Sequence, residues 1–114
     1  MIPIYPTFRT VALRIAVLLK RSGKQRARIS DKTLRILSQR GTLREALVSG
    51  VRAHLEDLGI VAIRLDRGGF ALIHATALDG APSALVKHLM PEYRKLNDEQ
   101  LWSELGLPDD EQDE

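Results

Sequence analysis

The chain has 114 residues, no cysteine and a formal net charge of +2 at pH 7. Its length suits one modest domain, and the lack of cysteine excludes disulfides, thiolate catalysis and cysteine-ligated zinc. The small net charge conceals a division: residues 1–67 carry 14 Lys and Arg against 5 Asp and Glu, whereas residues 68–114 carry 3 against 10.

Residues 1–6 contain two prolines and are expected to form an extended arm. Residues 7–21 then show apolar side chains at helical spacing, so dense that the helix is apolar nearly all round. This pattern predicts either a central helix wrapped by its own chain or the seam of a dimer. Its apolar run, 11–19, contains Arg14 and is about half the length of a membrane span. With no signal peptide visible, we expect a cytoplasmic protein that does not enter a membrane.

Residues 24–29 alternate polar and apolar side chains, which favours a short edge strand. Ser30 is a good N-cap for a helix over 31–39 whose Leu34 and Leu37 face inward. Gly41 is expected to end that helix with a left-handed backbone.

The next four residues, 42–45, read as a capping box in which Thr42 and Glu45 satisfy backbone N–H groups reciprocally. They predict a helix over 42–58, closed by Gly59. On a helical wheel one side carries Leu43, Leu47, Val51, Leu55 and Leu58, and the opposite side carries Glu45, Val48, Ser49, Arg52 and Glu56.

Two β-rich runs follow, 60–65 and 70–75, joined by Asp-Arg-Gly-Gly at 66–69. Glycines that accept positive φ favour a tight connection, so these residues predict a hairpin with a basic tip.

The carboxyl-terminal third begins with a linker at 79–82. Ser83 is expected to cap a helix that Pro91 kinks or restarts, and Asn97 with Gln100 resembles a second capping box. This helical extension, 83–106, contains Trp102 and either completes the core or offers a partner surface. Residues 107–114 form an acidic tail, which either aids solubility or competes with an anionic ligand for the basic half.

The order helix, short strand, helix, turn, helix and glycine-tipped hairpin resembles the winged helix-turn-helix superfamily over residues 7–77. Gly41 with Thr42 between the second and third helices, and Leu58-Gly59-Ile60 before the hairpin, support the resemblance. It implies an α+β, mostly helical fold for these residues, which the carboxyl-terminal helical extension then follows. It also implies that helix 42–58 enters the major groove of DNA while the wing, 64–70, touches the backbone or minor groove.

A basic half with this layout predicts a nucleic-acid binder. Exposed polar side chains of the third helix would reach base edges, and basic side chains elsewhere would hold phosphates. The candidate DNA-binding residues are Lys24, Arg26, Arg28, Lys32, Arg35, Thr42, Arg44, Glu45, Ser49, Arg52, Arg64 and Arg67.

No catalytic constellation is visible, and the spacing of His54, His74 and His88 matches no metal-ligand motif. We therefore expect neither an enzyme nor a bound metal or cofactor.

Two functions remain open. The first is a small DNA-binding protein, acting as a dimeric transcriptional regulator on double-stranded DNA. The alternative is a winged-helix interaction module that assembles a larger complex with weak or no DNA binding, meeting a protein partner through its carboxyl-terminal extension. Glu45 and Glu56 beside Arg52 favour the alternative, because they make the third helix only weakly basic.

Overall fold

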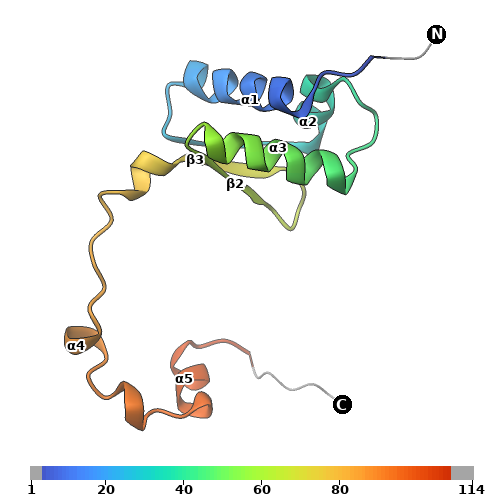
Figure 1. Ribbon diagram of the computed structural model, residues 1–114. Coiled ribbons are helices and arrows are strands. Elements are labelled where there is room, and N and C mark those ends of the chain that lie inside the picture. The colour runs from blue at the N-terminus through green and yellow to red at the C-terminus, as the bar shows by residue number, and fades with distance from the viewer. Residues whose placement is uncertain (1–3, 109–114) are drawn as a thin grey trace, which may run out of the picture. The chain divides into compact units, whose positions relative to one another are not determined.

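The computed structural model describes residues 4–108, which divide into one compact unit that ends at Ala81 and a second that begins at Pro82. The first unit is an α+β fold (Figure 1). Its elements are α1 (Phe8–Ser22), β1 (Arg26–Ile29), α2 (Asp31–Ser38), α3 (Glu45–Asp57), β2 (Ile60–Arg64), β3 (Phe70–His74) and the 3-10 turn η1 (Ala75–Leu78).

The three strands form an antiparallel sheet in the order β1-β3-β2. Ala27 pairs with Leu72, which pairs in turn with Ala62, and Ile29 pairs with Phe70. All five of these side chains face the core, because side chains alternate along a strand and Ile29, Ala62, Phe70 and Leu72 are buried. The hairpin and the edge position of β1 were both predicted from the sequence, and both are confirmed.

The core lies between α1, α3 and this face of the sheet (Figure 1). Gly50 of α3 lies against the Phe8 ring of α1, and an added Cβ would overlap that ring. The core residues on these helices are Val11, Ala12, Ile15 and Leu19 of α1 and Leu47, Val48, Val51 and Leu55 of α3.

Helix α1 is buried on one side only. Val17 and Leu18 are 44% and 40% exposed, and they form an apolar surface with Leu13 and Leu37. Within the first unit, therefore, α1 is not wrapped completely, and the other residues of that unit leave one apolar face of it open.

The predicted end of α2 needs correction. The left-handed residue is Gln39, with φ 56°, while Gly41 has no positive φ. Arg14 explains the difference, because its guanidinium donates to the carbonyl of Leu37 at 2.6 Å and to Oε1 of Gln39 at 2.9 Å. A cation at a helix carboxyl end satisfies carbonyls that the helix leaves open.

The predicted capping box at 42–45 is wrong. Helix α3 begins at Glu45, its N-cap is Arg44, and no side chain caps it. Leu43 instead packs against the core from the loop before the helix, so packing moves the helix start past Thr42.

The predicted faces of this helix also need two corrections. Val48 was placed on the exposed side but is buried, at 7% exposed, because α3 packs against both α1 and β2. Leu58 was placed inward but is 43% exposed, because it lies beyond the last helical residue.

The second unit contains short elements only: α4 (Val86–Leu89), the 3-10 turn η2 (Tyr93–Lys95) and α5 (Asp98–Glu104). The capping box of Asn97 and Gln100 is confirmed, with bonds of 2.8 and 2.9 Å. The predicted cap at Ser83 is wrong, because α4 begins at Val86 after Leu85. The predicted acidic tail falls mainly on residues 109–114, which lie outside the described residues, as do residues 1–3 of the predicted arm.

None of the helices in residues 4–108 is long and apolar enough to cross a membrane.

Candidate nucleic-acid interface

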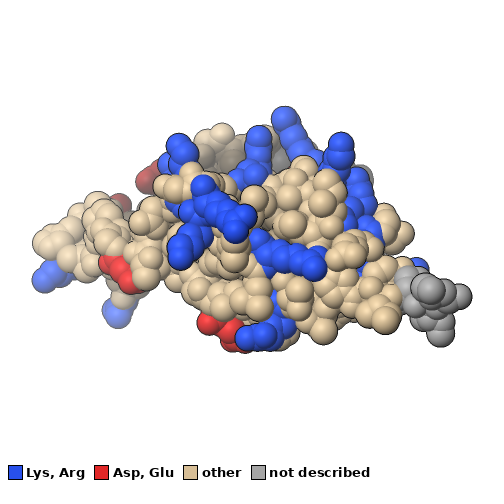
Figure 2. Space-filling view, turned by 90° about the horizontal axis from the view of Figure 1, so that it is seen from above, with Lys and Arg blue, Asp and Glu red and all other residues tan. Residues whose placement is uncertain are grey.

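All twelve residues predicted to contact DNA are exposed, and all of them belong to the first unit. Figure 2 shows one face of the protein, on which Lys and Arg side chains are numerous and acidic side chains few. The structure separates the candidates into a group around α2 and α3, a group along β1, and the hairpin turn, residues 65–69, with the strand residue Arg64 beside it.

The group around α3 is partly engaged within the protein. The hydroxyl of Ser49 donates to the carbonyl of Glu45 at 2.8 Å, which fixes that side chain along the helix. Arg52 donates from Nε to the carbonyl of Ala62 in β2 at 3.0 Å. Its two terminal amino groups have no hydrogen-bond partner among residues 4–108, so they remain able to bind a base or a phosphate. Thr42 and Arg44 stand exposed in the loop before the helix, and Lys32 and Arg35 stand exposed on α2.

Arg64 is exposed, but its guanidinium is engaged by other side chains of the protein. It forms a two-pronged ion pair with Asp31, with N–O distances of 2.5 and 3.3 Å, and its guanidinium lies 5.0 Å from the centre of the Phe70 ring. The same carboxylate accepts from the backbone N–H of Gly69 at 2.8 Å. These contacts fasten the hairpin turn to the first residue of α2, so we leave Arg64 out of the proposed phosphate contacts.

The hydrogen bond from Arg64 holds the pKa of Asp31 below its usual value of 3.8, and the N–H of Gly69 lowers that pKa further. Because the folded-state pKa is the lower one, this pair stabilises the fold above pH 3.8 and is lost as the pH falls through the lowered value.

Replacing Asp31 by Asn is therefore expected to reduce the free energy of unfolding near neutral pH by up to about 1 kcal/mol, the range of an exposed ion pair. The difference from the unaltered protein should shrink to nothing in strong acid. Thermal unfolding recorded across pH measures it, and Asp66→Asn, an exposed carboxylate in the hairpin turn, is the matched control. A difference between Asp31→Asn and the unaltered protein that stays undiminished as the solution is made strongly acidic would show that the carboxylate charge is not the cause.

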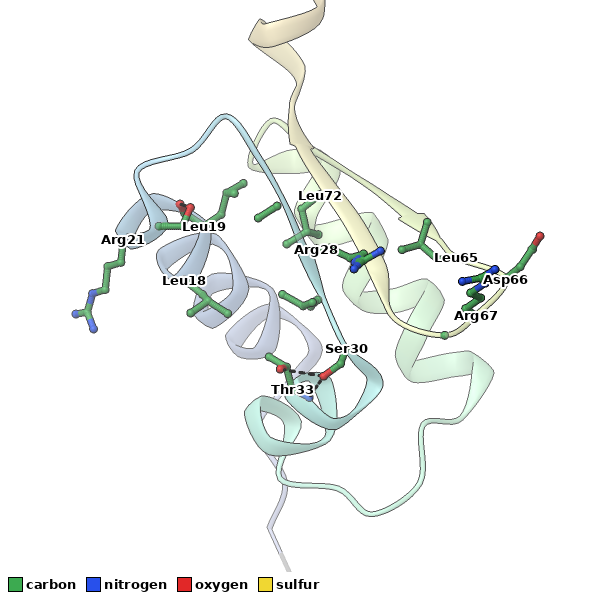
Figure 3. A pocket seen from close by; sticks show the side chains of 14 residues that line it. Leu18, Leu19, Arg21, Arg28, Ser30, Thr33, Leu65, Asp66, Arg67 and Leu72 are labelled. Atoms are coloured by element: carbon green, nitrogen blue, oxygen red, sulfur yellow. Dashed lines mark hydrogen bonds between the residues drawn. The ribbon is translucent and has the colours of Figure 1, made fainter.

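Along β1, the side chains of Arg26 and Arg28 point away from the core, because their neighbours Ala27 and Ile29 face it. Lys24 lies in the turn before the strand. An open groove follows β1 from the end of α1 to the hairpin turn (Figure 3), and it brings Arg28 and Arg67 to the same depression.

Sequence reasoning missed Arg21, the third arginine that lines this groove. The signal was the basic pair Lys20 and Arg21 at the end of α1, directly before the strand. Arg40 serves another purpose: it donates to the carbonyl of Pro6 at 3.2 Å and lies over the rings of Tyr5 and Phe8 at 4.8 and 5.3 Å, which fixes the chain before α1.

His54 and His74 are half-buried and His88 is exposed. Within residues 4–108, no group of three or more His, Asp or Glu side chains lies close enough together to hold a metal ion.

No known family model matches the chain, and neither the curated proteins nor the solved structures yield a match.

Proposed function

We propose that the first unit is a winged helix-turn-helix domain and that the protein is a small DNA-binding transcriptional regulator. The observation that carries the proposal is the topology: α1, β1, α2, α3 and a hairpin, with β1 paired to the second strand of that hairpin in the order β1-β3-β2. The order of these elements along the chain is the one on which the sequence resemblance rests. The topology supports the fold part of the proposal, and the exposed basic side chains of the site support the DNA-binding part.

The proposed contact places the exposed side of α3, from Glu45 to Arg52, in the major groove. A helix fits that groove, and its first exposed turns reach base edges. Ser49 and the free amino groups of Arg52 are the side chains there that can recognise a base, with Thr42 and Arg44 just before the helix. Arg67 in the hairpin turn would touch the backbone or the minor groove.

Phosphate contacts supply the affinity in this proposal. Lys32, Arg35, Arg44 and Arg67 are exposed and form no ion pair among the described residues. Opposing acids are few, because residues 1–67 hold 5 acids against 14 basic residues. Such an excess favours DNA at low salt whatever its sequence.

The open apolar face of α1 supports a second part of the proposal, a homodimer. Leu13, Val17 and Leu18 with Leu37 form a surface that a second copy would cover. A two-fold dimer would favour a palindromic site with half-sites about one helical turn apart. Light scattering tests this directly, since a particle of 12.8 kDa both free and on DNA would contradict it.

The alternative is an interaction module with weak or no DNA binding. It is favoured by the exposed side of α3, where Glu45 and Glu56 accompany Arg52 and where Ala46 and Ala53 offer no polar group. That module would co-purify with a protein partner and show no preferred DNA sequence.

Two arginine variants test the reading of the site. Arg52→Ala should relax sequence preference at one position and cost about 1–3 kcal/mol on a duplex selected from random sequence, with little effect on random duplex. Arg67→Ala should weaken selected and random duplexes about equally. Arg9→Ala, an exposed arginine on the first turn of α1, is the control. If both test variants bind both duplexes as Arg9→Ala does, the proposed interface is wrong.

A further inference from the structure

The two edges of the sheet differ in whether their outward backbone groups form hydrogen bonds. At the β2 edge, the carbonyl of Ala62 accepts from Nε of Arg52. At the β1 edge, no described residue forms a hydrogen bond with the outward backbone groups of Arg26 or Arg28. An open edge is a template for pairing with another chain.

The hydrogen-bond pattern establishes which groups point outward. The N–H of His74 donates to the carbonyl of Gln25 at 3.0 Å. Because bonded and non-bonded pairs alternate in an antiparallel ladder, the pairs 27 with 72 and 29 with 70 are bonded, while Arg26 and Arg28 turn their N–H and C=O groups away from β3. The other side of β3 agrees with this pattern. There the N–H of Ala75 donates to the carbonyl of Gly59, so successive residues of β3 bond alternately to β1 and to β2.

The groove in Figure 3 runs beside this open edge. Leu18 of α1, which is 40% exposed, lies on one side of it, and Ala27 and Ile29 of β1 lie in its floor. Arg28 and Arg67 also line it, and Asp66 is its one acidic lining residue. The depression thus combines apolar side chains of α1 and β1 with three basic side chains, Arg21, Arg28 and Arg67.

We propose that β1 binds an extended acidic segment of a partner protein, which adds to the sheet as a fourth strand. Residues of that segment opposite Arg26 and Arg28 lie on the outer face, where Asp or Glu would form cross-strand ion pairs. Residues opposite Ala27 and Ile29 face Leu18 and should be apolar. The fitting partner therefore alternates acidic and apolar residues, and its main chain bonds to the outward groups of β1.

A second copy of this chain fits the edge less well. Pairing β1 with another β1 would bring Arg26 and Arg28 of each copy together, and like charges across strands destabilise the pair. DNA also fits less well. Its charged phosphates gain nothing from contact with apolar side chains, and they only accept hydrogen bonds, whereas the edge of β1 presents both N–H donors and C=O acceptors. In addition, β1 and β2 are separated by β3, so β1 lies about 10 Å from the strand that α3 contacts.

The probe for this site is a short fluorescent peptide of alternating glutamate and valine, added to the full chain. Fluorescence anisotropy should show saturable binding, and amide exchange should slow at Arg26 and Arg28. A peptide with lysine in place of glutamate should bind at least about tenfold more weakly. A peptide methylated on alternate backbone nitrogens, which cannot complete the ladder, should not bind.

The double variant Arg26→Glu with Arg28→Glu should reverse this preference and bind the lysine peptide instead, which shows that the variant still folds. Arg9→Glu, exposed and outside the groove, should behave as the unaltered protein.

Equal binding of both peptides by the unaltered protein would overturn the proposal. So would a fall in duplex DNA affinity in the double variant without any peptide binding, which would assign the edge to nucleic acid. Self-association that the double variant abolishes would assign it to a second copy.

Discussion

Alanine in place of Gly69 is expected to lower the free energy of unfolding by about 3 kcal/mol, the largest stability effect of a single exchange in the hairpin turn. Gly69 has φ 82°, a conformation that costs a residue with a side chain about 1–2 kcal/mol. The remainder comes from space, since an added Cβ would overlap the main-chain oxygen of Ile29 and lie 3.2 Å from Cα of Ser30. Backbone atoms of β1 can move only by distorting the sheet.

Two other glycines separate these causes. Gly23 has φ 72° but open space around a Cβ, so Gly23→Ala should cost only the conformational part, about 1–2 kcal/mol. Gly41 has neither a positive φ nor a neighbour within 4 Å, so Gly41→Ala should change stability by less than about 0.5 kcal/mol. Urea unfolding of the three variants measures the series. Equal losses at Gly23 and Gly69 would show that the hairpin turn does not press on β1.

Local signals predicted the parts of this fold that depend on a few adjacent residues. Ser30 caps α2 by accepting from the N–H of Thr33 at 3.1 Å, and Asn97 caps α5 as expected. The glycines at 68 and 69 do adopt positive φ in the predicted hairpin turn. In each case the interaction joins residues no more than a few positions apart.

Predictions failed where a distant side chain decided the outcome. The end of α2 is set by Arg14, which lies 25 residues before Gln39, and the start of α3 follows the packing of Leu43 and not the cap signal at Thr42. The helical-wheel prediction that Val48 points outward holds only for a helix with one buried side. Helix α3 packs against both α1 and β2, so it buries more than one side.

The candidate site shows the same limit. The sequence pattern predicts that the twelve residues are exposed. It does not predict which of them are free to bind DNA and which already bind another group of the protein. Arg64 is occupied by Asp31, 33 residues away, and Nε of Arg52 by Ala62. No local sequence pattern predicts either contact, because both depend on how the sheet packs against the helices.

The second large effect concerns salt. Four phosphate contacts, from Lys32, Arg35, Arg44 and Arg67, predict a slope of about −3.6 in a plot of log affinity against log salt concentration. Affinity for duplex DNA should then fall about 150-fold between about 50 and 200 mM salt, and more steeply if two copies bind together. Arg67→Ala should make the slope shallower by about 0.9, while Arg9→Ala should leave it unchanged.

The most direct test of the proposed DNA binding is the affinity of the full chain for a labelled duplex, measured by fluorescence anisotropy across this salt range. A straight line with a slope of about −3.6 or steeper, shallower in Arg67→Ala, is the result that a winged-helix DNA-binding protein predicts. No binding at about 50 mM salt, or a slope near zero, would contradict DNA binding and leave the interaction module as the better account.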